Sequence, residues 1–573
     1  MRSIMILTLA LIVFAFLYFS FFSRFDIIAA DEGYFNLACF RIMNGELPYR
    51  DFFLHTPPLS YYLQACIFKI FGPSFFVGRL TMAVVGVFIV MLLVLISLRL
   101  AVMPYPLLPG LLFTFWGVSH IPYPSFNWYG LLSALTIIPV IFKFTDSGDR
   151  RCLMLTGLLT TLLCLTKQNL GAAAILSLAF YIVIYRFFND GRKFVLIKDI
   201  FLDYIFIGLG ASLATIPVML FFYMNGALKD LVYYLFNFSY AALKMRMEAV
   251  PFPHLKISTF LILGIYLLFA CLAHGAIIKK RFKGLYTPVF IAALGTALFY
   301  KFASKDTIIY VVDHIKEGLL NGFFNLPALF ILLAAYFSVR KAFKMNTLDK
   351  TDLCLVCMVI FSFFYIWFGL IIARDMIHLI PTMAISYGFF GYFLNRLRKV
   401  ITAYYFIFPV FFFCLFGLIM NINNETFRSS SSRLTGMNYR MKSDRAKFLV
   451  VERSKGSYLD EMTDYIISNT RPEERIFAFH IDSSIYILAD KMPGTFNTFF
   501  LADAFRREEQ KRVIEDLVKN NVKLIACDKR TYDSWYDKQN FDREGLTSAI
   551  TGFLHDNFEE VETFGPYNIL VKK

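Results

Sequence analysis

Two adjacent acidic residues, Asp31 and Glu32, are the first candidates for chemistry in this sequence. They follow an apolar run at about residues 3–22, where a carboxylate held at a membrane surface could act as a general base. With an ordinary pKa of about 4, such a carboxylate is ionised at neutral pH and can accept a proton from a hydroxyl. The alternative is that Asp31 caps the helix that follows, with Glu32 favoured by the dipole of that helix.

Cationic side chains lie near the ends of several other apolar runs, and charges near membrane depth are costly and often functional. Several cations on one membrane face could together hold a phosphate group, although each could instead be an interfacial anchor. Asp375 could orient one of them. The candidates are Arg79, Lys167 in Thr166-Lys167-Gln168-Asn169, and both Arg374 and His378 in Arg374-Asp375-Met376-Ile377-His378-Leu379-Ile380-Pro381.

Further polar residues follow Asp31 in the motifs Tyr49-Arg50-Asp51-Phe52 and His55-Thr56-Pro57-Pro58. Asp51 could serve as a base in place of Asp31, or it could pair with its neighbour Arg50. Candidates for contacts to an acceptor or within the loop are Tyr49, Asp51, His55 and Asn127.

The composition places these residues in a membrane protein. The chain has 573 residues, of which 58% are hydrophobic and 18% aromatic. A soluble protein of this length cannot bury that much apolar surface, because too much of it remains exterior. The net charge of +15 does not indicate nucleic-acid binding, since the basic residues lie between apolar runs as membrane-flanking charges do. The nine cysteines form no framework of disulfides or metal ligands.

The apolar runs predict about thirteen membrane-spanning helices, because a span needs about 20 apolar residues. Alternate gaps between them are rich in Lys and Arg, which predicts a cytoplasmic N-terminus, a multi-pass protein of the cell inner (plasma) membrane, and a C-terminal domain outside it. The predicted spans lie at about 3–22, 74–98, 104–119, 127–142, 152–166, 169–188, 200–223, 257–278, 284–300, 318–338, 352–373, 376–395 and 400–421.

Two outer segments are long. In the first, at about 23–73, we predict one short helix from Asp31 to Asn44-Gly45 and another from Thr56-Pro57-Pro58 to Gly72, both lying along the outer membrane surface. The second, at about 224–256, is rich in Tyr and Phe and is predicted to be an interfacial helix or a mobile lid.

The composition changes near residue 440, which divides the chain into a transmembrane module at 1–425 and a soluble domain at 440–573. Alternating strands and helices in the second part predict a small α/β domain. We expect strands at 447–451, 475–480, 522–527 and 567–571, and helices at about 457–468, 503–520 and 544–557. It has no Gly-rich phosphate loop, and His480 and Asp482 at a strand end fit loop or helix-cap roles.

At the quoted motifs the sequence resembles the GT-C superfamily of membrane glycosyltransferases, most of all the branch of protein O-mannosyltransferases and the lipid A aminoarabinose transferase. The resemblance covers nearly the whole chain and rests on the order of short motifs: Asp31-Glu32, Tyr49-Arg50-Asp51, Pro57-Pro58, Arg79, Thr166-Lys167, and Arg374 with His378 and Pro381.

The resemblance implies transfer of a sugar, with inversion, from a polyprenyl monophosphate donor on the outer face of the membrane. Asp31 matches the catalytic acid of the family, with Glu32 beside it, and Arg79, Lys167, Arg374 and His378 match the region that would hold the donor phosphate. No cofactor or catalytic metal is implied. Relatives often have a second acidic residue after the third span, where this sequence has Asn127, which cannot act as a base.

The resemblance leaves the sugar and the acceptor open, and the acceptor could be lipid A, another envelope glycan or a protein hydroxyl. The partners implied are the donor, the acceptor and the lipid bilayer, with no nucleic acid. Two other functions fit the same composition. One is a transporter or flippase of lipid-linked sugars, although the sequence has no obvious repeat and its charges gather at one face. The other is a ligase or polymerase that uses a polyprenyl pyrophosphate oligosaccharide.

Overall fold

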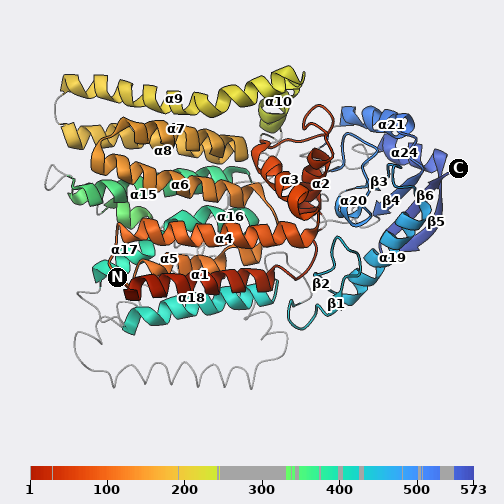
Figure 1. The fold of residues 1–573 in the computed structure, drawn as a ribbon, viewed down its shortest axis with the longest axis horizontal. Helices are drawn as coiled ribbons and strands as arrows, with labels where there is room; N and C mark the ends of the chain where they lie inside the picture. The colour runs from red at the N-terminus through yellow and green to blue at the C-terminus, as the bar shows by residue number, and fades with distance from the viewer. Residues whose placement is uncertain are drawn as a thin grey trace.

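The computed structural model places most of the chain. The residues it describes are 2–28, 30–190, 193–241, 244, 331–336, 338–341, 348–372, 376–397, 404–424, 432–480, 482–500, 505, 507–528 and 548–573. The long helices of the first part run side by side as a bundle, and the strands of the last part lie at one end of it (Figure 1).

Seven helical stretches in the described part of the chain are long and apolar enough to cross a membrane. Three shorter helices that also lie in the bundle are α5 (Leu107–Trp116), α7 (Arg150–Thr166) and α18 (Tyr404–Ile422). The seven stretches are formed by α1 (Arg2–Phe22), α4 (Phe75–Leu98), α6 (Phe126–Ser147), α8 (Gln168–Asp190), α9 (Lys193–Met224), α15 (Lys350–Ile372), and the joined α16 (Met376–Met383), η3 (Ala384–Ser386) and α17 (Tyr387–Leu397).

These helices correspond to ten of the thirteen predicted spans. The predicted spans at 257–278 and 284–300 lie outside the described residues, as does most of the one at 318–338. The chain is therefore a multi-pass helical membrane protein, while the count of thirteen stays a prediction.

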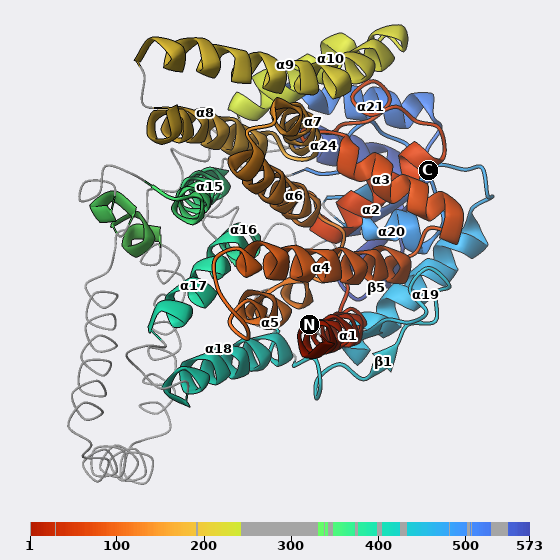
Figure 2. The same cartoon turned by 60° about the vertical axis from the view of Figure 1, so that its left-hand side comes forward.

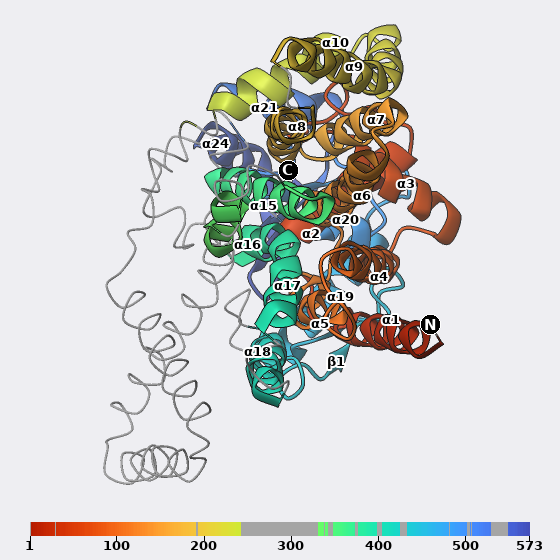
Figure 3. The ribbon, with the colours of Figure 1, turned by 90° about the vertical axis from the view of Figure 1, so that its left-hand side faces the viewer.

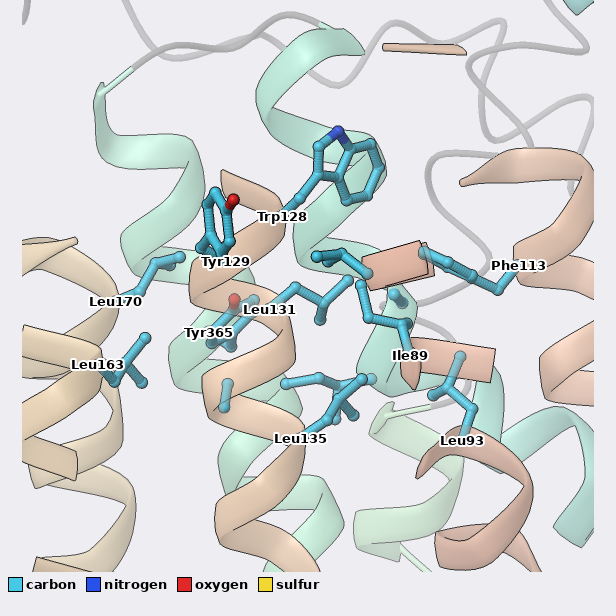
Figure 4. Packing of buried hydrophobic residues seen from close by; sticks show 14 of the residues in the cluster. Ile89, Leu93, Phe113, Trp128, Tyr129, Leu131, Leu135, Leu163, Leu170 and Tyr365 are labelled. Carbon is cyan, nitrogen blue, oxygen red and sulfur yellow. The ribbon is translucent and has the colours of Figure 1, made fainter. Parts of the chain in front are cut away.

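The helices carry apolar side chains both on their exposed outer faces and inside the bundle, as helices embedded in lipid do. Helices α1 and α9 lie at the edge of the bundle (Figure 3). They expose large apolar side chains such as Leu17, Ile197 and Leu213, which would be unfavourable in water. Inside the bundle, apolar side chains from α4, α5, α6 and α15 interlock around Trp128 and Leu131 (Figure 4). This rigid core supports the loops at the end of the bundle that faces the strands.

The first outer segment forms the two short helices predicted for it, α2 (Asp31–Met43) and α3 (Leu59–Phe71). Each is followed by a glycine with positive φ, Gly45 at +90° and Gly72 at +81°, a conformation that favours glycine over other residues. The prediction that both helices lie on the membrane surface is wrong for α2, which is buried along most of its length against the C-terminal part. By contrast, α3 exposes the apolar side chains of Ile70 and Phe71.

The second outer segment is helical where it is described. It forms α10 (Leu228–Val232) and a π-helical turn η2 (Tyr233–Phe238), which continues to residue 241. Tyr233 and Phe236 are exposed, whereas Tyr234 and Phe238 pack on Phe53 of the first outer segment. The segment is therefore helical with one exposed side, and its role as an interfacial helix or a lid stays a prediction.

The C-terminal part contains a four-stranded sheet in the order β3-β4-β6-β5. The pair β3 (Phe477–Phe479) and β4 (Leu524–Asp528) is parallel, and the pairs β4 with β6 (Tyr567–Lys572) and β6 with β5 (Phe558–Phe564) are antiparallel. A separate antiparallel pair consists of β1 (Tyr439–Arg440) and β2 (Val450–Val451). The helices among the described residues of this part are α19 (Arg453–Asn469), α20 (Ser484–Leu488), α21 (Gln510–Lys519) with the short turn η5 (Arg507–Glu509), and α24 (Ser548–Asn557).

The α/β architecture predicted for this part is confirmed, with three elements that were not predicted. These are strand β1, strand β5 at one edge of the sheet, and the short helix α20, which contacts α2 (Figure 2). Asp482 accepts a hydrogen bond of 3.0 Å from the backbone N–H of Ser484, which is a loop contact beside α20, because the cap position of that helix is Ser483.

Candidate active site at the end of the helix bundle that faces the strands

Asp31 is exposed and is the first residue of α2. The cap position of this helix is occupied by Ala30, and no side chain caps it, so the interpretation of Asp31 as the helix cap is wrong. Its carboxylate Oδ2 instead accepts a hydrogen bond of 3.3 Å from the hydroxyl of Tyr123, which lies in the connection between η1 (Val118–His120) and α6. The helix dipole stabilises the ionised form of a carboxylate at this end of α2.

Glu32, the next residue, points into the protein and forms a fully buried ion pair with Arg79 of α4. Nε and Nη2 of Arg79 each donate to one carboxylate oxygen of Glu32, both at 2.6 Å. The remaining nitrogen, Nη1, donates to the backbone carbonyls of Ser23 at 3.1 Å and Phe25 at 2.8 Å. The backbone N–H of Ile28 completes the pair by donating to Glu32 Oε2 at 3.0 Å.

This arrangement differs from the roles that the sequence suggested for both residues. All three nitrogens of Arg79 have acceptors inside the protein, and both oxygens of Glu32 have donors, so neither group faces the surface where a donor phosphate would lie. A buried charge needs an opposite charge and full hydrogen bonding, and this pair provides both. Its effect is to tie the connection between α1 and α2 to α4, which fixes the position of Asp31.

Two close approaches of glycine backbone help to position the candidate site. A Cβ atom on Gly33 would lie 2.6 Å from the backbone nitrogen of Ser484 in α20, so only glycine allows α2 to approach the C-terminal part this closely. A Cβ atom on Gly78 of α4 would lie 2.8 Å from the ring of Pro124. The second approach positions the connection that carries Tyr123.

Lys167 and Asn127 come together at the same end of the bundle. Lys167 follows α7 directly, is buried, and donates through Nζ to Oδ1 of Asn127 near the start of α6. The ammonium also lies 5.1 Å from the ring centre of Phe126, at a distance where a cation is attracted to an aromatic face. Tyr123, which touches Asp31, and Asn127, which touches Lys167, therefore belong to one short segment that joins the acidic and the basic candidate.

Two other candidates, Tyr49 and Asp51, form hydrogen bonds with neighbouring residues of the first outer segment. Tyr49 is buried with φ of +70°, and its hydroxyl donates to the backbone carbonyl of Thr56 at 2.7 Å. Asp51 accepts hydrogen bonds from Arg50 at 2.8 Å and from the backbone N–H of Leu47 at 2.7 Å. The hydrogen bond from Arg50 holds the pKa of the Asp51 carboxyl below its ordinary value.

His55 is half-buried and stacks on Tyr34 and Phe53, with ring centres 6.1 and 5.7 Å away. Its backbone carbonyl accepts a hydrogen bond of 3.0 Å from Ser239 Oγ, and Gln168, the neighbour of Lys167, donates to the same hydroxyl at 3.4 Å. The second outer segment thus contacts both the first outer segment, at His55, and the residue next to Lys167.

The last two cationic candidates are Arg374 and His378. Arg374, together with Asp375, lies outside the described residues. His378 is half-buried in α16, which packs on α6 and α15, and its backbone carbonyl accepts a hydrogen bond of 3.0 Å from Thr382 Oγ1. Their contact with a donor phosphate stays a prediction.

The packing of the C-terminal part against the first outer segment was not predicted from the sequence. The backbone N–H of Phe53 donates to the carbonyl of Phe496 at 3.1 Å, Tyr34 packs on Phe499 with ring centres 5.0 Å apart, and Nη1 of Arg41 donates to the carbonyl of Thr495 at 3.1 Å. These contacts join residues more than 400 positions apart. The described residues contain no group of three side chains that could hold a metal ion.

Comparison with protein-family models and with curated protein sequences finds no match for this chain. Among solved structures, the chain is similar to the archaeal oligosaccharyltransferase AglB from Archaeoglobus fulgidus, in complex with an inhibitory peptide and a dolichol-phosphate. The identity is 14% and the TM-score 0.49, over 99% of this chain and 74% of that one. It is also similar to ArnT from Cupriavidus metallidurans bound to undecaprenyl phosphate, with 14% identity and a TM-score of 0.41 over 99% of this chain and 97% of that one.

Both proteins are GT-C superfamily membrane glycosyltransferases, the superfamily that the sequence motifs resemble. Because the identities are 14% and the TM-scores lie below 0.5, the function of this chain has to be inferred from its own residues.

Proposed function

We propose that this chain is an inverting glycosyltransferase that moves a hexose or pentose from a polyprenyl monophosphate donor to a hydroxyl of an envelope acceptor. The observation that carries the proposal is the position of Asp31. Its carboxylate is exposed, does not cap α2, and is joined through Tyr123 to the segment that holds the ammonium of Lys167. A base and a cation at one end of a membrane bundle are the groups that this reaction needs.

In the proposed reaction, Asp31 accepts the proton of the acceptor hydroxyl as its oxygen attacks the anomeric carbon of the sugar. The bond between that carbon and the phosphate oxygen breaks, and the electron pair leaves with the polyprenyl phosphate. The hydrogen bond from Tyr123 orients the carboxylate towards the acceptor. Attack on the face opposite the leaving phosphate gives inversion at the anomeric carbon.

The leaving phosphate gains negative charge, and a nearby cation stabilises it. We assign this role to Lys167, with Arg374 and His378 as further candidates. Asn127 positions the ammonium of Lys167 but, being neutral, does not neutralise it as a carboxylate would. Glu32 and Arg79 are positioning residues in this proposal, because each fully occupies the hydrogen-bonding groups of the other.

The location of the site suits a lipid-linked donor. The polyprenyl chain can lie in the bilayer beside the apolar helices while its phosphate reaches the end of the bundle, which brings both reactants together. On this proposal that end is extracytoplasmic, the membrane is the inner or plasma membrane, and the N-terminus is cytoplasmic. Contacts of the second outer segment and the C-terminal part around His55 would help to exclude water, which would otherwise hydrolyse the donor.

The proposal is tested with the purified full chain in lipid nanodiscs, supplied with a panel of polyprenyl monophosphate sugars and an envelope extract as acceptor. Mass spectrometry is expected to detect free polyprenyl monophosphate and a glycosylated acceptor with wild type, and neither product with Asp31→Asn. The matched control is Asp444→Asn, because the side chain of Asp444 is 94% exposed and lies in the C-terminal part. Turnover only with polyprenyl pyrophosphate oligosaccharides would contradict the proposed donor and favour a ligase.

A further inference from the structure

Arg433 is a buried cation that the proposed reaction does not use. It follows α18, where its backbone N–H donates to the carbonyl of Ile422 at 2.8 Å, and its side chain is 1% exposed. The guanidinium lies between residues of three elements: Phe22 of α1, Ser119 of η1 and Asn421 of α18. Both α1 and α18 end here, on the side of the bundle that faces the strands (Figure 1).

The hydrogen bonds that Arg433 makes to described residues use only one of its three nitrogens. Nη1 donates to the backbone carbonyl of Ser119 at 2.7 Å and to Oδ1 of Asn421. Nε is buried and, among the residues that the structure places, has no acceptor, and none is bonded to Nη2 either. No residue that the structure describes therefore accepts a hydrogen bond from the edge formed by Nε and Nη2.

Arg79 in the same protein shows what this edge of a guanidinium binds. Its Nε and Nη2 each hold one carboxylate oxygen of Glu32 at 2.6 Å, while Nη1 donates to two backbone carbonyls, as Nη1 of Arg433 donates to the carbonyl of Ser119. The two arginines thus have the same pattern of bonding, except that the anion is supplied by the chain at Arg79 and by no described residue at Arg433. Such an edge binds carboxylate or phosphate oxygens in pairs.

The charge of Arg433 is also left without a neighbouring carboxylate in the described structure. Its contacts with Ser119, Asn421 and Phe22 are all to neutral groups. Burial lowers the pKa of Arg433 to about 9, only partly opposed by the more distant charge of Asp26, which itself pairs with Lys455 at 2.8 Å. A buried, uncompensated guanidinium is unfavourable unless an anion joins it.

We propose that the Nε–Nη2 edge of Arg433 is a binding site for a phosphate group at the outer ends of α1 and α18. The phosphate comes from a phospholipid headgroup or from the aqueous phase, and both present the same pair of anionic oxygens. Near these ends the two helices expose apolar side chains, Phe21 on α1 and Ile419 on α18, which places the site at the level of lipid headgroups. The site does not involve Asp31 or Lys167.

The first experiment measures thermal unfolding of the purified full chain in detergent against inorganic phosphate, with chloride at matched ionic strength as reference. Phosphate is expected to raise the melting temperature of wild type. Arg433→Gln is expected to weaken phosphate binding about tenfold to a hundredfold, the loss of one charge-assisted contact. Arg440→Gln is the matched control, because Arg440 is an exposed arginine on β1 and should leave the shift unchanged.

Asn421→Asp keeps the test decisive if Arg433→Gln does not fold. Its carboxylate would lie against the guanidinium of Arg433 and neutralise it in place, so this variant should melt at a higher temperature than wild type and lose the response to phosphate. Lys167→Met, which alters the proposed donor site, should keep the response. A response that is lost in Lys167→Met and kept in Asn421→Asp would overturn the proposal, as would no response in wild type.

The second experiment identifies the source of the phosphate by native mass spectrometry of protein released from phosphatidylglycerol nanodiscs. If a lipid headgroup fills the site, wild type retains one phosphatidylglycerol more than Asn421→Asp, and the lipid removes the response to inorganic phosphate. If free phosphate fills the site, lipid retention is equal and the response to inorganic phosphate persists in phosphatidylglycerol. Equal retention together with no phosphate response in wild type would overturn the proposal.

Discussion

Arg79 and Glu32 form a fully buried ion pair directly beside Asp31, with both nitrogen–oxygen distances at 2.6 Å. The pair joins α4 to the first turn of α2, and Arg79 also binds the carbonyls of Ser23 and Phe25 in the connection from α1. The buried pair therefore fixes the backbone around Asp31, while the carboxylate of Asp31 stays exposed. A base held in this way does not have to be ordered when the substrates bind.

Breaking this pair is expected to cost stability rather than substrate affinity. Glu32→Gln leaves the guanidinium of Arg79 buried without its counter-charge, which should destabilise the fold by about 3–5 kcal/mol. Arg79→Met should have a similar effect, and the double variant should be less unstable than the sum of the two. Thermal and denaturant unfolding of purified protein measure this. If Arg79→Met kept full stability and only raised the KM for the donor, Arg79 would be a phosphate ligand.

A carboxylate beside Lys167 is expected to slow the reaction. In Asn127→Asp the new charge would neutralise the ammonium, which should reduce kcat/KM at least about tenfold, equivalent to ~1.4 kcal/mol of transition-state stabilisation. Asn127→Ala is the control, since it removes the hydrogen bond without adding charge and should retain more activity. Steady-state kinetics with the donor decide the matter, and an Asn127→Asp variant as active as wild type would exclude Lys167 from the proposed role.

Acid should weaken the junction between the first outer segment and the C-terminal part. Burial acts to raise the pKa of Asp26, but the ammonium of Lys455, 2.8 Å away, lowers it below the ordinary value. A lowered pKa in the folded state stabilises the fold above the ordinary pKa of about 4, and this stabilisation is lost as the pH falls below it. Between roughly pH 5 and pH 3, the melting temperature should fall more steeply for wild type than for Asp26→Asn. Parallel pH profiles would show that the pair contributes nothing.

The close approach of α2 to α20 should not tolerate a side chain. In Gly33→Ala the new methyl group would lie 2.6 Å from the backbone nitrogen of Ser484, so α2 must shift, at a cost of about 1–3 kcal/mol. The shift would also move Asp31, so turnover should fall in protein that remains folded. Gly208→Ala is the matched control in α9, because a Cβ atom there meets no atom within 4 Å. Equal stability and turnover in both variants would show that the contact does not position the site.

Local patterns in the sequence predicted the helices that carry the candidate site. Asp31 and the Asn44-Gly45 pair bounded α2, and Pro58 and Gly72 bounded α3, because these residues have strong preferences at helix ends that depend on no distant contact. The ten predicted spans that the structure describes as helices followed from the length of the apolar runs, which also depends on no distant contact.

Features that depend on distant contacts could not be predicted in this way. Glu32 and Arg79 are 47 positions apart, and nothing local indicates that they pair, although two lone charges near one membrane face make pairing a reasonable hypothesis. The burial of α2 depends on contacts with α20 and with the segment around Phe496. Strand β5 was missed because its exposed acidic residues, such as Glu559 and Glu560, obscure the alternation of a strand at the edge of a sheet.

The central claim, that Asp31 is the base of a transferase with a polyprenyl monophosphate donor, is tested most directly in cells. The measurement is mass spectrometry of polyprenyl-linked lipids in cells that carry wild type, Asp31→Asn or the exposed-site control Asp444→Asn, with equal amounts of folded protein. A polyprenyl monophosphate sugar is expected to accumulate only with Asp31→Asn, and its mass would identify the donor. Identical lipid profiles for all three proteins would contradict the catalytic role of Asp31, and accumulation of a pyrophosphate-linked oligosaccharide would contradict the proposed donor.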